Sequence, residues 1–204
     1  MCLDFCNTGQ GARDRGGVEW LAGFDDLLNW LDASAALKPE YVRRFRHAAD
    51  HAPDYASKFR LRAIALRETL HRVFEARVRG EVPSRADLAR LEAEYAQGAA
   101  FAQLAWEHGR GTWKLDPAVT ELAAMLQPIM HSAADLLTSD ALARLRRCGN
   151  PTCSWLFIDE TRNRSRRWCE MASCGNVLKV RRHRARTRKI IANGRRAARA
   201  VRKT

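Results

Sequence analysis

The feature that most constrains this chain is a group of four cysteines near its C-terminal end. They form two pairs, Cys148-x4-Cys153 and Cys169-x4-Cys174, and fifteen residues separate the pairs. Two close pairs joined by a loop are the pattern with which a short chain surrounds a tetrahedral Zn²⁺ ion with four thiolates. Four sulfur ligands leave no open coordination position, so the spacing predicts one structural zinc ion rather than a catalytic one.

Three alternative roles for four neighbouring cysteines fit the sequence less well. Independent buried thiols have no reason to fall into pairs, a disulfide needs an oxidising compartment, and an iron–sulfur cluster uses a different spacing. The N-terminal sequence Met-Cys-Leu-Asp-Phe-Cys lacks the basic and apolar regions of a secretory signal. No apolar run approaches the ~20 residues that a membrane-spanning helix needs. We therefore expect a cytoplasmic protein whose thiols are reduced.

Positive charge is concentrated in the same part of the chain. The formal net charge is +13. Residues 1–140 carry 17 Lys and Arg against 20 Asp and Glu, whereas residues 141–204 carry 19 against 3, a net of +16. A charge run is usually a solvated basic face, but so uneven a distribution favours a polyanionic partner. DNA is the expected partner, RNA is the alternative, and no membrane partner is expected.

The residues that follow Cys174 are expected to form a basic helix that ends near Gly194. Its first turn would pack Val177, Leu178 and Val180 against the finger. Because a helix has the width that a DNA major groove admits, the zinc ion would set the origin and direction of a cationic rod. Further arginines lie between the cysteine pairs. The predicted nucleic-acid-binding residues are Arg162, Arg164, Arg166, Arg167, Lys179, Arg181, Arg182, Arg184, Arg186, Arg188 and Lys189.

The aromatic residues of the finger have two possible roles. Trp155 and Trp168 can stack on unpaired bases, as in RNA or single-strand binding. So small a module needs its aromatic residues inside, however, which favours a role in the finger core. Trp155, Phe157 and Ile158 are expected to form the apolar core of a hairpin in the spacer between the two cysteine pairs.

The rest of the chain predicts an α+β fold with a mostly helical N-terminal domain. The sequence CLDFCNT alternates apolar and polar residues, which predicts a short strand, and a turn-rich exposed loop follows at 9–17. A β-hairpin is expected over 100–115. Helices are predicted at 24–34, from Pro39, at 53–80, at 84–98, at 117–137 with a kink at Pro128, and at 141–147 after an N-cap at 138–140.

The remaining cysteines and the histidines predict no further site. Cys2 and Cys6 have no second pair beside them, so we expect core thiols. His47 and His51 have a metal-compatible spacing, but the sequence offers no third ligand. There is no evident nucleophile–base pair or phosphate loop, so no catalytic residue and no enzyme activity are predicted.

The C-terminal motifs resemble the bacterial CGNR zinc-finger family. That family's finger has a first cysteine pair, then LF-D-SRN-RRWC, then CGN-R-x-K-V-RRH. The matching segments here, between Cys148 and His183, are LFID, TRNRSRRWC and CGNVLKVRRH. One position departs, because Val177 stands where the family has the arginine that completes its name. The resemblance implies a zinc-bound, DNA-binding C-terminal segment.

The N-terminal part resembles the partner domain of that family, called ABATE and described as a stress-induced transcription regulator. The resemblance lies in CLDFCNT, the Arg-rich loop after it, and LLNWL. It implies an α/β domain that senses an unidentified ligand or mediates homodimerisation. Family members usually have residues before this motif, so we expect an N-terminal strand segment to be missing here. Asp4, Asn7 and Arg13 are the candidate ligand contacts, because polar residues near the end of a strand often bind ligands.

These expectations define an architecture and a function. The ABATE-like domain is expected over 1–138, the zinc finger with its basic helix over 139–192, and a basic tail over 193–204. The expected function is that of a zinc-dependent DNA-binding transcriptional regulator, which would be cytoplasmic and associated with the nucleoid. The alternatives are an RNA-binding zinc-finger protein and an enzyme with its site in the N-terminal domain.

Overall fold

The computed structural model describes residues 1–10, 17–180, 184 and 187, and helices make up most of this part of the chain. The α-helices are α1 (Cys2–Cys6), α2 (Phe24–Ala33), α3 (Pro39–Asp50), α4 (Pro53–Arg79), α5 (Arg85–Ala99) and α6 (Gln127–Thr138). Shorter helical turns are the 3-10 helices η2 (Leu122–Leu126) and η3 (Asp140–Arg144) and the π-helical turn η4 (Met171–Gly175). The predicted mostly helical fold is confirmed.

The strands form antiparallel pairs between near neighbours in the sequence. These pairs are β1 (Gly9–Gln10) with β2 (Val18–Glu19), β3 (Ala102–Glu107) with β4 (Arg110–Leu115), and β5 (Leu145–Arg147) with β6 (Leu156–Ile158). The β3–β4 hairpin is the one predicted over 100–115. Of the predicted loop at 9–17, Gly9 and Gln10 form a strand, while residues 11–16 lie outside the described part of the chain.

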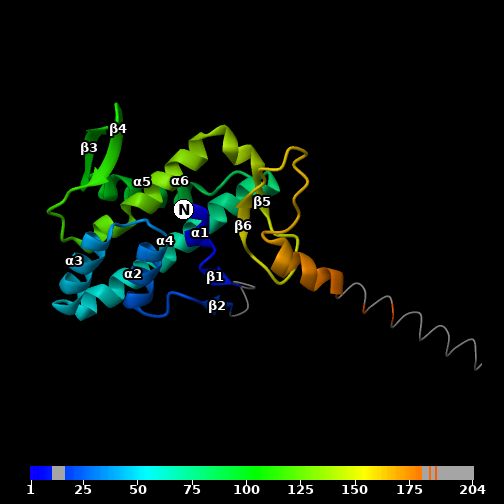
Figure 1. Cartoon of the computed structure of the whole chain (residues 1–204), viewed down its shortest axis with the longest axis horizontal. Coiled ribbons are helices and arrows are strands. Elements are labelled where there is room, and N and C mark those ends of the chain that lie inside the picture. The colour runs from blue at the N-terminus through cyan, green and yellow to red at the C-terminus, as the bar shows by residue number, and fades with distance from the viewer. Residues whose placement is uncertain (11–16, 181–183, 185–186, 188–204) are drawn as a thin grey trace, which may run out of the picture.

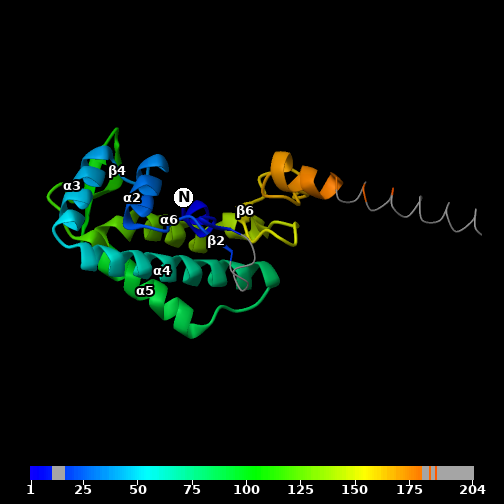
Figure 2. The ribbon, with the colours of Figure 1, turned by 90° about the horizontal axis from the view of Figure 1, so that it is seen from below.

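Helix α4 forms the axis of the N-terminal region (Figure 1). Phe59, Leu66, Leu70 and Phe74 recur at helical spacing and are buried, which gives α4 the apolar face on which the other helices pack. The helix ends at Gly80, whose φ of +73° is the left-handed conformation that favours glycine at a helix C-terminus. Figure 2 shows α5 running beside α4, with α2 and α3 at one end of the molecule and the finger at the other.

The sequence CLDFCNT is a helix, not the predicted strand. Helix α1 buries Phe5, Cys2 and Cys6 on one side, because residues three and four apart lie on one helical face. Five residues are too few to distinguish a period of 2 from a period of 3.6, so the alternation was misleading. The prediction that Cys2 and Cys6 are core thiols is confirmed. Their thiols donate to the carbonyl oxygens of Ser132 (3.5 Å) and Arg67 (4.0 Å).

The segment before the finger also differs from the prediction. Residues 122–126 form a 3-10 helix, and α6 begins only at Gln127, so Pro128 lies in the first turn of a helix rather than at a kink. Proline is favoured there because its missing N–H is not needed in a first turn. The expected helix at 141–147 is divided between η3 and strand β5. The hydroxyl of Ser139 donates back to the carbonyl of Leu136 (3.1 Å) instead of capping a new helix.

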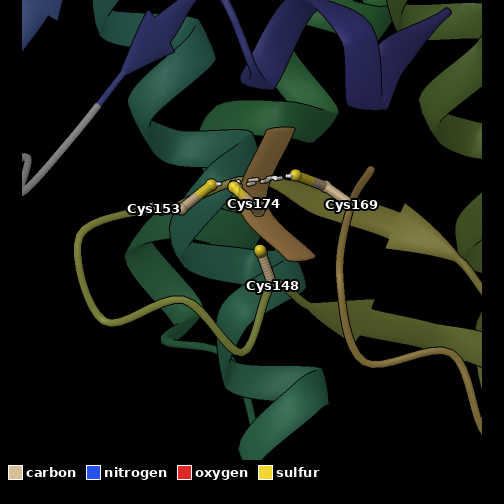
Figure 3. A group of neighbouring side chains, drawn as sticks. All are labelled: Cys148, Cys153, Cys169 and Cys174. Atoms are coloured by element: carbon tan, nitrogen blue, oxygen red, sulfur yellow. Dashed lines mark hydrogen bonds between the residues drawn. The ribbon is translucent and has the colours of Figure 1, made fainter. Parts of the chain in front are cut away.

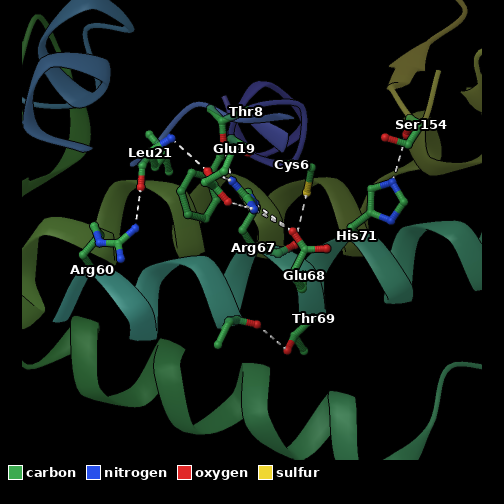
Figure 4. Close-up of polar contacts among 12 residues, drawn as sticks. Cys6, Thr8, Glu19, Leu21, Arg60, Arg67, Glu68, Thr69, His71 and Ser154 are labelled. Carbon is green, nitrogen blue, oxygen red and sulfur yellow. Dashed lines mark hydrogen bonds and ion pairs between the residues drawn. The ribbon is translucent and has the colours of Figure 1, made fainter. Parts of the chain in front are cut away.

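A partly buried ion pair connects β2 to the middle of α4 (Figure 4). Arg67 is buried, and its guanidinium donates to both carboxylate oxygens of Glu19, at 2.7 and 2.6 Å. The same guanidinium donates to the hydroxyl of Thr8 (3.1 Å), and Arg60 donates to the carbonyl of Leu21 (2.8 Å). These contacts hold both ends of the segment around β1 and β2 on α4. In the described part of the chain, none of the helices combines the length and apolarity that a membrane crossing requires.

Candidate metal centre

The sulfurs of the two cysteine pairs converge at one point beside η4 (Figure 3). All four Sγ atoms lie within 4.8 Å of one another. The Sγ of Cys169 lies 3.9 Å from that of Cys153 and 3.7 Å from that of Cys174. Four sulfurs tetrahedrally arranged at ~2.3 Å from one zinc ion would be about 3.8 Å apart, whereas a disulfide bond is only ~2.05 Å long. The four thiols can therefore hold one structural zinc ion, as the spacing predicts.

Two turns present these sulfurs from different parts of the finger. Cys148 and Cys153 lie in the turn between β5 and β6, where the amide of Cys148 donates to the carbonyl of Trp155 (2.9 Å). Cys169 lies two residues before η4, and Cys174 lies within it. The β-hairpin of the finger therefore encloses the first cysteine pair. The prediction of a hairpin in the spacer was wrong, because β6 pairs with the strand that precedes Cys148.

Trp168 fills the space between the two turns, and two glycines make room for it. A Cβ atom at Gly149 would lie 2.9 Å from the Trp168 ring and 3.0 Å from the carbonyl oxygen of Arg167. A Cβ atom at Gly175 would lie 3.0 Å from the same ring and would overlap the sulfur of Met171. Real Cβ contacts are almost never shorter than 3.0 Å, so the turn at Gly149 requires glycine, whereas at Gly175 a Cβ atom would require the Met171 side chain to move. Trp168 is partly buried between the two turns, which supports the core role expected for it.

The pKa values of the thiols show why the cluster suits a cation. Burial, and to a lesser extent the nearby cysteines, raises the pKa of the Cys153 thiol to about 12. Burial likewise raises the pKa of Cys169. Burial acts in the same direction on Cys174, but hydrogen bonds from the Asn150 amide (3.4 Å) and from the neighbouring thiols outweigh it and lower its pKa. Since zinc binds thiolates, binding must release protons and requires the ion's charge to offset the repulsion among the sulfurs.

The loop between the cysteine pairs is organised by a buried carboxylate. Asp159 accepts hydrogen bonds from the amide (3.0 Å) and hydroxyl (2.5 Å) of Thr161 and from the amide of Arg166 (2.9 Å). These bonds, that of the Thr161 hydroxyl first, hold the pKa of Asp159 below its usual range. The side chain of Arg166 then donates to the carbonyls of Trp168 (2.9 Å) and Cys169. Arg166 therefore supports a metal ligand directly.

The predicted cationic residues fall into three groups. Arg166 and Arg167 are exposed but lie over the rings of Phe157 (4.6 Å) and Trp168 (5.2 Å). Four more are exposed and have no ion pair among the described residues: Arg162, Arg164, Lys179 and Arg184. The others lie outside the described residues: Arg181, Arg182, Arg186, Arg188 and Lys189.

The predicted basic helix is described over 176–180, where it follows η4 directly. Its expected packing was partly wrong. Val177 and Val180 are exposed, and only Leu178 is partly buried. The helix therefore leaves the metal site with most of its surface open to solvent.

Comparison with known families agrees with this arrangement. Residues 1–140 match the ABATE family, described as "Putative stress-induced transcription regulator", and residues 144–187 match the CGNR zinc finger. The chain belongs to the ABATE family. Among curated proteins, none matches it. The two matched families are regulator and zinc-finger families rather than enzyme families.

The CGNR finger is fastened to the ABATE domain through strand β6. The side-chain amide of Asn7 donates to the carbonyl of Leu156 and accepts from its amide, both at 2.9 Å. Leu145 and Leu156 are buried in the same apolar core as the helices of the ABATE domain. The two matched segments therefore share one core in this structure.

Three further contacts, two from α4 and one from the residue after β2, complete this junction. His71 Nε2 donates to the carbonyl of Ser154 (2.9 Å), as Figure 4 shows. Glu75 accepts from Arg147 at 2.6 Å and pairs with Arg79. The Trp20 and Trp155 rings meet edge to face with centroids 5.9 Å apart. Sequence reasoning missed His71 and Glu75, because polar residues on a long amphipathic helix look the same whether they face solvent or another segment.

The candidate ligand contacts of the ABATE domain have different positions. Asp4 is exposed on α1, Asn7 is buried in the junction with Leu156, and Arg13 lies outside the described residues. Asp4 and Asn7 both border a cavity of about 600 Å³ between α1, α6 and β6, which extends to Cys169. His47 and His51, whose spacing is compatible with a metal, are linked by a hydrogen bond between His51 Nδ1 and the His47 carbonyl (2.8 Å). In the described part of the chain, the metal-compatible cluster is that of the four cysteines.

Proposed function

We propose that this ABATE-family protein is a zinc-dependent, DNA-binding transcriptional regulator. The observation that carries the proposal is the position of the four-thiol site. It lies where η4 passes into the helical residues 176–180, at the start of the most basic stretch of the sequence. The segment 141–204 has a net charge of +16, and a charge this concentrated is the electrostatic footprint of a nucleic-acid partner.

The residues of the finger would have distinct tasks in this function. Zinc, when bound, supplies folding free energy, of order 10 kcal/mol in comparable small modules. Arg162, Arg164, Lys179 and Arg184 are exposed, so they are available to contact phosphates, which give affinity and position but no sequence information. Sequence would be read by arginine in the major groove, where a guanidinium donates two bonds to guanine.

The structure favours duplex DNA over the RNA alternative on one ground. Base stacking needs an available aromatic face, whereas Trp168 is packed between the cysteine turns and Trp155 against Trp20. A sensed ligand would bind in the cavity of about 600 Å³ at the junction of the ABATE domain and the finger, because this cavity borders both α1 and the metal ligand Cys169. The protein would act in the cytoplasm at the nucleoid.

The direct test is binding of the zinc-loaded protein to genomic DNA fragments, with structured RNA as competitor. We expect chelation, or Cys169→Ser, to abolish binding. If about five cations neutralise phosphates, log affinity should fall with log salt with a slope of roughly −4 to −5. Binding that survives chelation, or that is insensitive to salt, would refute the proposal. Preference for the RNA would favour the alternative.

A charge-removal series localises the interface. Arg162→Ala with Arg164→Ala should lower the magnitude of the salt slope by about two, because each phosphate contact contributes roughly one. Arg43→Ala with Arg77→Ala is the matched control, since both residues are also exposed but lie on α3 and α4 of the ABATE domain. Equal effects of the two changes would show that the finger loop is not the interface.

A further inference from the structure

The β3–β4 hairpin projects from the end of the molecule opposite the finger (Figures 1 and 2). Leu104 pairs with Trp113 across the two strands, and Trp106 pairs with Gly111. Because side chains alternate along a strand and paired residues share a face, Leu104, Trp106 and Trp113 all lie on one face. They are 63%, 76% and 53% exposed, respectively.

In this hairpin the apolar face is exposed and much of the polar face is partly buried, the reverse of the usual arrangement. An antiparallel pair normally buries its apolar face and leaves its polar face in water. Here the other face carries Glu107, Thr112 and Lys114, which are partly buried, and Lys114 forms an ion pair with Glu107. In the described part of the chain, each of the two strands pairs with the other alone. An exposed apolar face with open strand edges on both sides indicates an association surface.

A hollow beside the hairpin complements the projecting side chains. It is a cavity of about 460 Å³ between β4, the α2–α3 connection and the start of α6. Trp113 and Leu115 border it on the hairpin side, and Tyr41, Pro128 and His131 on the helical side. Trp106, near the hairpin tip, is the most exposed aromatic residue of the described chain. A projecting indole and a cavity large enough to receive one therefore occur next to each other on one face.

We propose that this face pairs with the same face of a second copy of the chain. In a two-fold dimer the same patch serves both subunits, so each Trp106 would enter the cavity of the other subunit beside Trp113. When one surface carries both the projecting side chain and the cavity that receives it, two copies related by a two-fold axis satisfy each other. No unpaired contact is then left to bind a third copy. A second copy is thus the occupant that supplies both complementary shapes.

The two exposed tryptophans supply about half of the area that a dimer needs. With about 250 Å² for a fully buried indole, the two tryptophans leave roughly 320 Å² open per copy, or about 650 Å² for the pair. Specific interfaces bury at least ~1,200 Å² in total, so the tryptophans would provide about half. Leu104 and the walls of the cavity would provide the remainder.

This proposal gives a contact surface to the homodimerisation that the family resemblance implies, and it rests on the proposed function only for its purpose. Because the hairpin and the finger lie at opposite ends, pairing would leave both fingers open to DNA. Doubling the phosphate contacts raises affinity, and a two-fold dimer favours DNA with repeated half-sites.

The test is the oligomeric state of the zinc-loaded full chain, measured by sedimentation velocity over a wide concentration range. We expect a reversible dimer. Trp106→Thr should raise the dissociation constant of the dimer by about a hundredfold, since a central aromatic residue is lost from each copy. Leu61→Thr is the matched control, because Leu61 is 56% exposed but lies on α4. Leu104→Thr provides a second variant on the same face should Trp106→Thr fail to fold, which circular dichroism and zinc content would reveal.

Three outcomes would overturn this inference. They are a monomer at every concentration, a dimer that Trp106→Thr and Leu104→Thr do not weaken, and equal weakening by Leu61→Thr. DNA binding is measured separately on the same samples. A dimer without DNA affinity would contradict only the proposed function, and a monomer with zinc-dependent DNA affinity would contradict only the dimer.

Discussion

Replacing Asn7 by alanine tests whether the finger and the ABATE domain form one cooperative unit. The Asn7 amide satisfies both backbone groups of Leu156, although 149 residues separate the two in the sequence. Both residues are buried. In Asn7→Ala the Leu156 amide and carbonyl would remain buried without these partners, because a methyl group neither donates nor accepts.

The expected cost follows from those two groups. A buried backbone group that loses its partner costs about 1–3 kcal/mol, so two such groups predict a loss of about 2–6 kcal/mol in the free energy of unfolding. That is a large fraction of the 5–15 kcal/mol that stabilises a typical domain. Because Leu156 lies in the apolar core, the loss should appear in the unfolding of the whole structure rather than of the finger alone.

Urea denaturation of the zinc-loaded protein, followed by far-UV circular dichroism, measures this quantity. Asn163→Ala is the control, since Asn163 is exposed in the finger loop, and it should change stability by less than about 0.5 kcal/mol. The same denaturation measurements on both variants after chelation show whether zinc and Asn7 act together. If zinc holds β6 in place, the loss of unfolding free energy caused by Asn7→Ala should be smaller without zinc than with it. An Asn7→Ala protein as stable as Asn163→Ala, or a finger that melts in a separate transition, would refute the idea of one unit.

Three further changes probe the metal site and the ion pair. Metal analysis should find one zinc ion per chain, and Cys169→Ser should remove it. Gly149→Ala should weaken zinc affinity at least tenfold in a competition assay with a chromogenic chelator, because its methyl group would displace Trp168. Burial raises the pKa of Glu19, but hydrogen bonds from Arg67 and from a backbone amide outweigh it and keep the pKa below its ordinary value. Stability from this pair should therefore be full above the ordinary value, ~4.3, and be lost as the pH falls through the lower folded value. The difference in unfolding free energy between wild type and Glu19→Gln should accordingly narrow with acidification.

Features set by neighbouring residues could be read from the sequence. The four zinc ligands are recognisable because two turns of fixed length must each deliver two sulfurs to one ion. The end of α4 at Gly80 and the N-cap of α5 at Ser84 have equally local causes. In α1, by contrast, five residues carry too little periodicity, and burial of Phe5 beneath other helices decides that the segment is helical.

Features set by contacts between distant segments could not be read. The role of Asn7 depends on Leu156, and that of His71 on Ser154, and no periodicity links such positions. The apolar residues of the spacer predict a hairpin because they look sufficient for a small core. In fact Leu156 lies in the core of the ABATE domain and Ile158 packs against that core, so the finger relies on a hydrophobic surface that its own length cannot supply.

This shared core changes what the metal can do. In an isolated finger, zinc would fix the direction of the basic helix relative to the finger alone. Here Cys148 and Cys153 flank the turn between β5 and β6, and β6 is held by Asn7 of α1. A bound zinc ion would therefore also fix the start of that helix, residues 176–180, relative to the ABATE domain. Because Asn7 and Cys169 border the same cavity, a molecule that moves α1 there would act on both the fastening of β6 and a zinc ligand, which gives the ABATE domain a direct physical route to the finger.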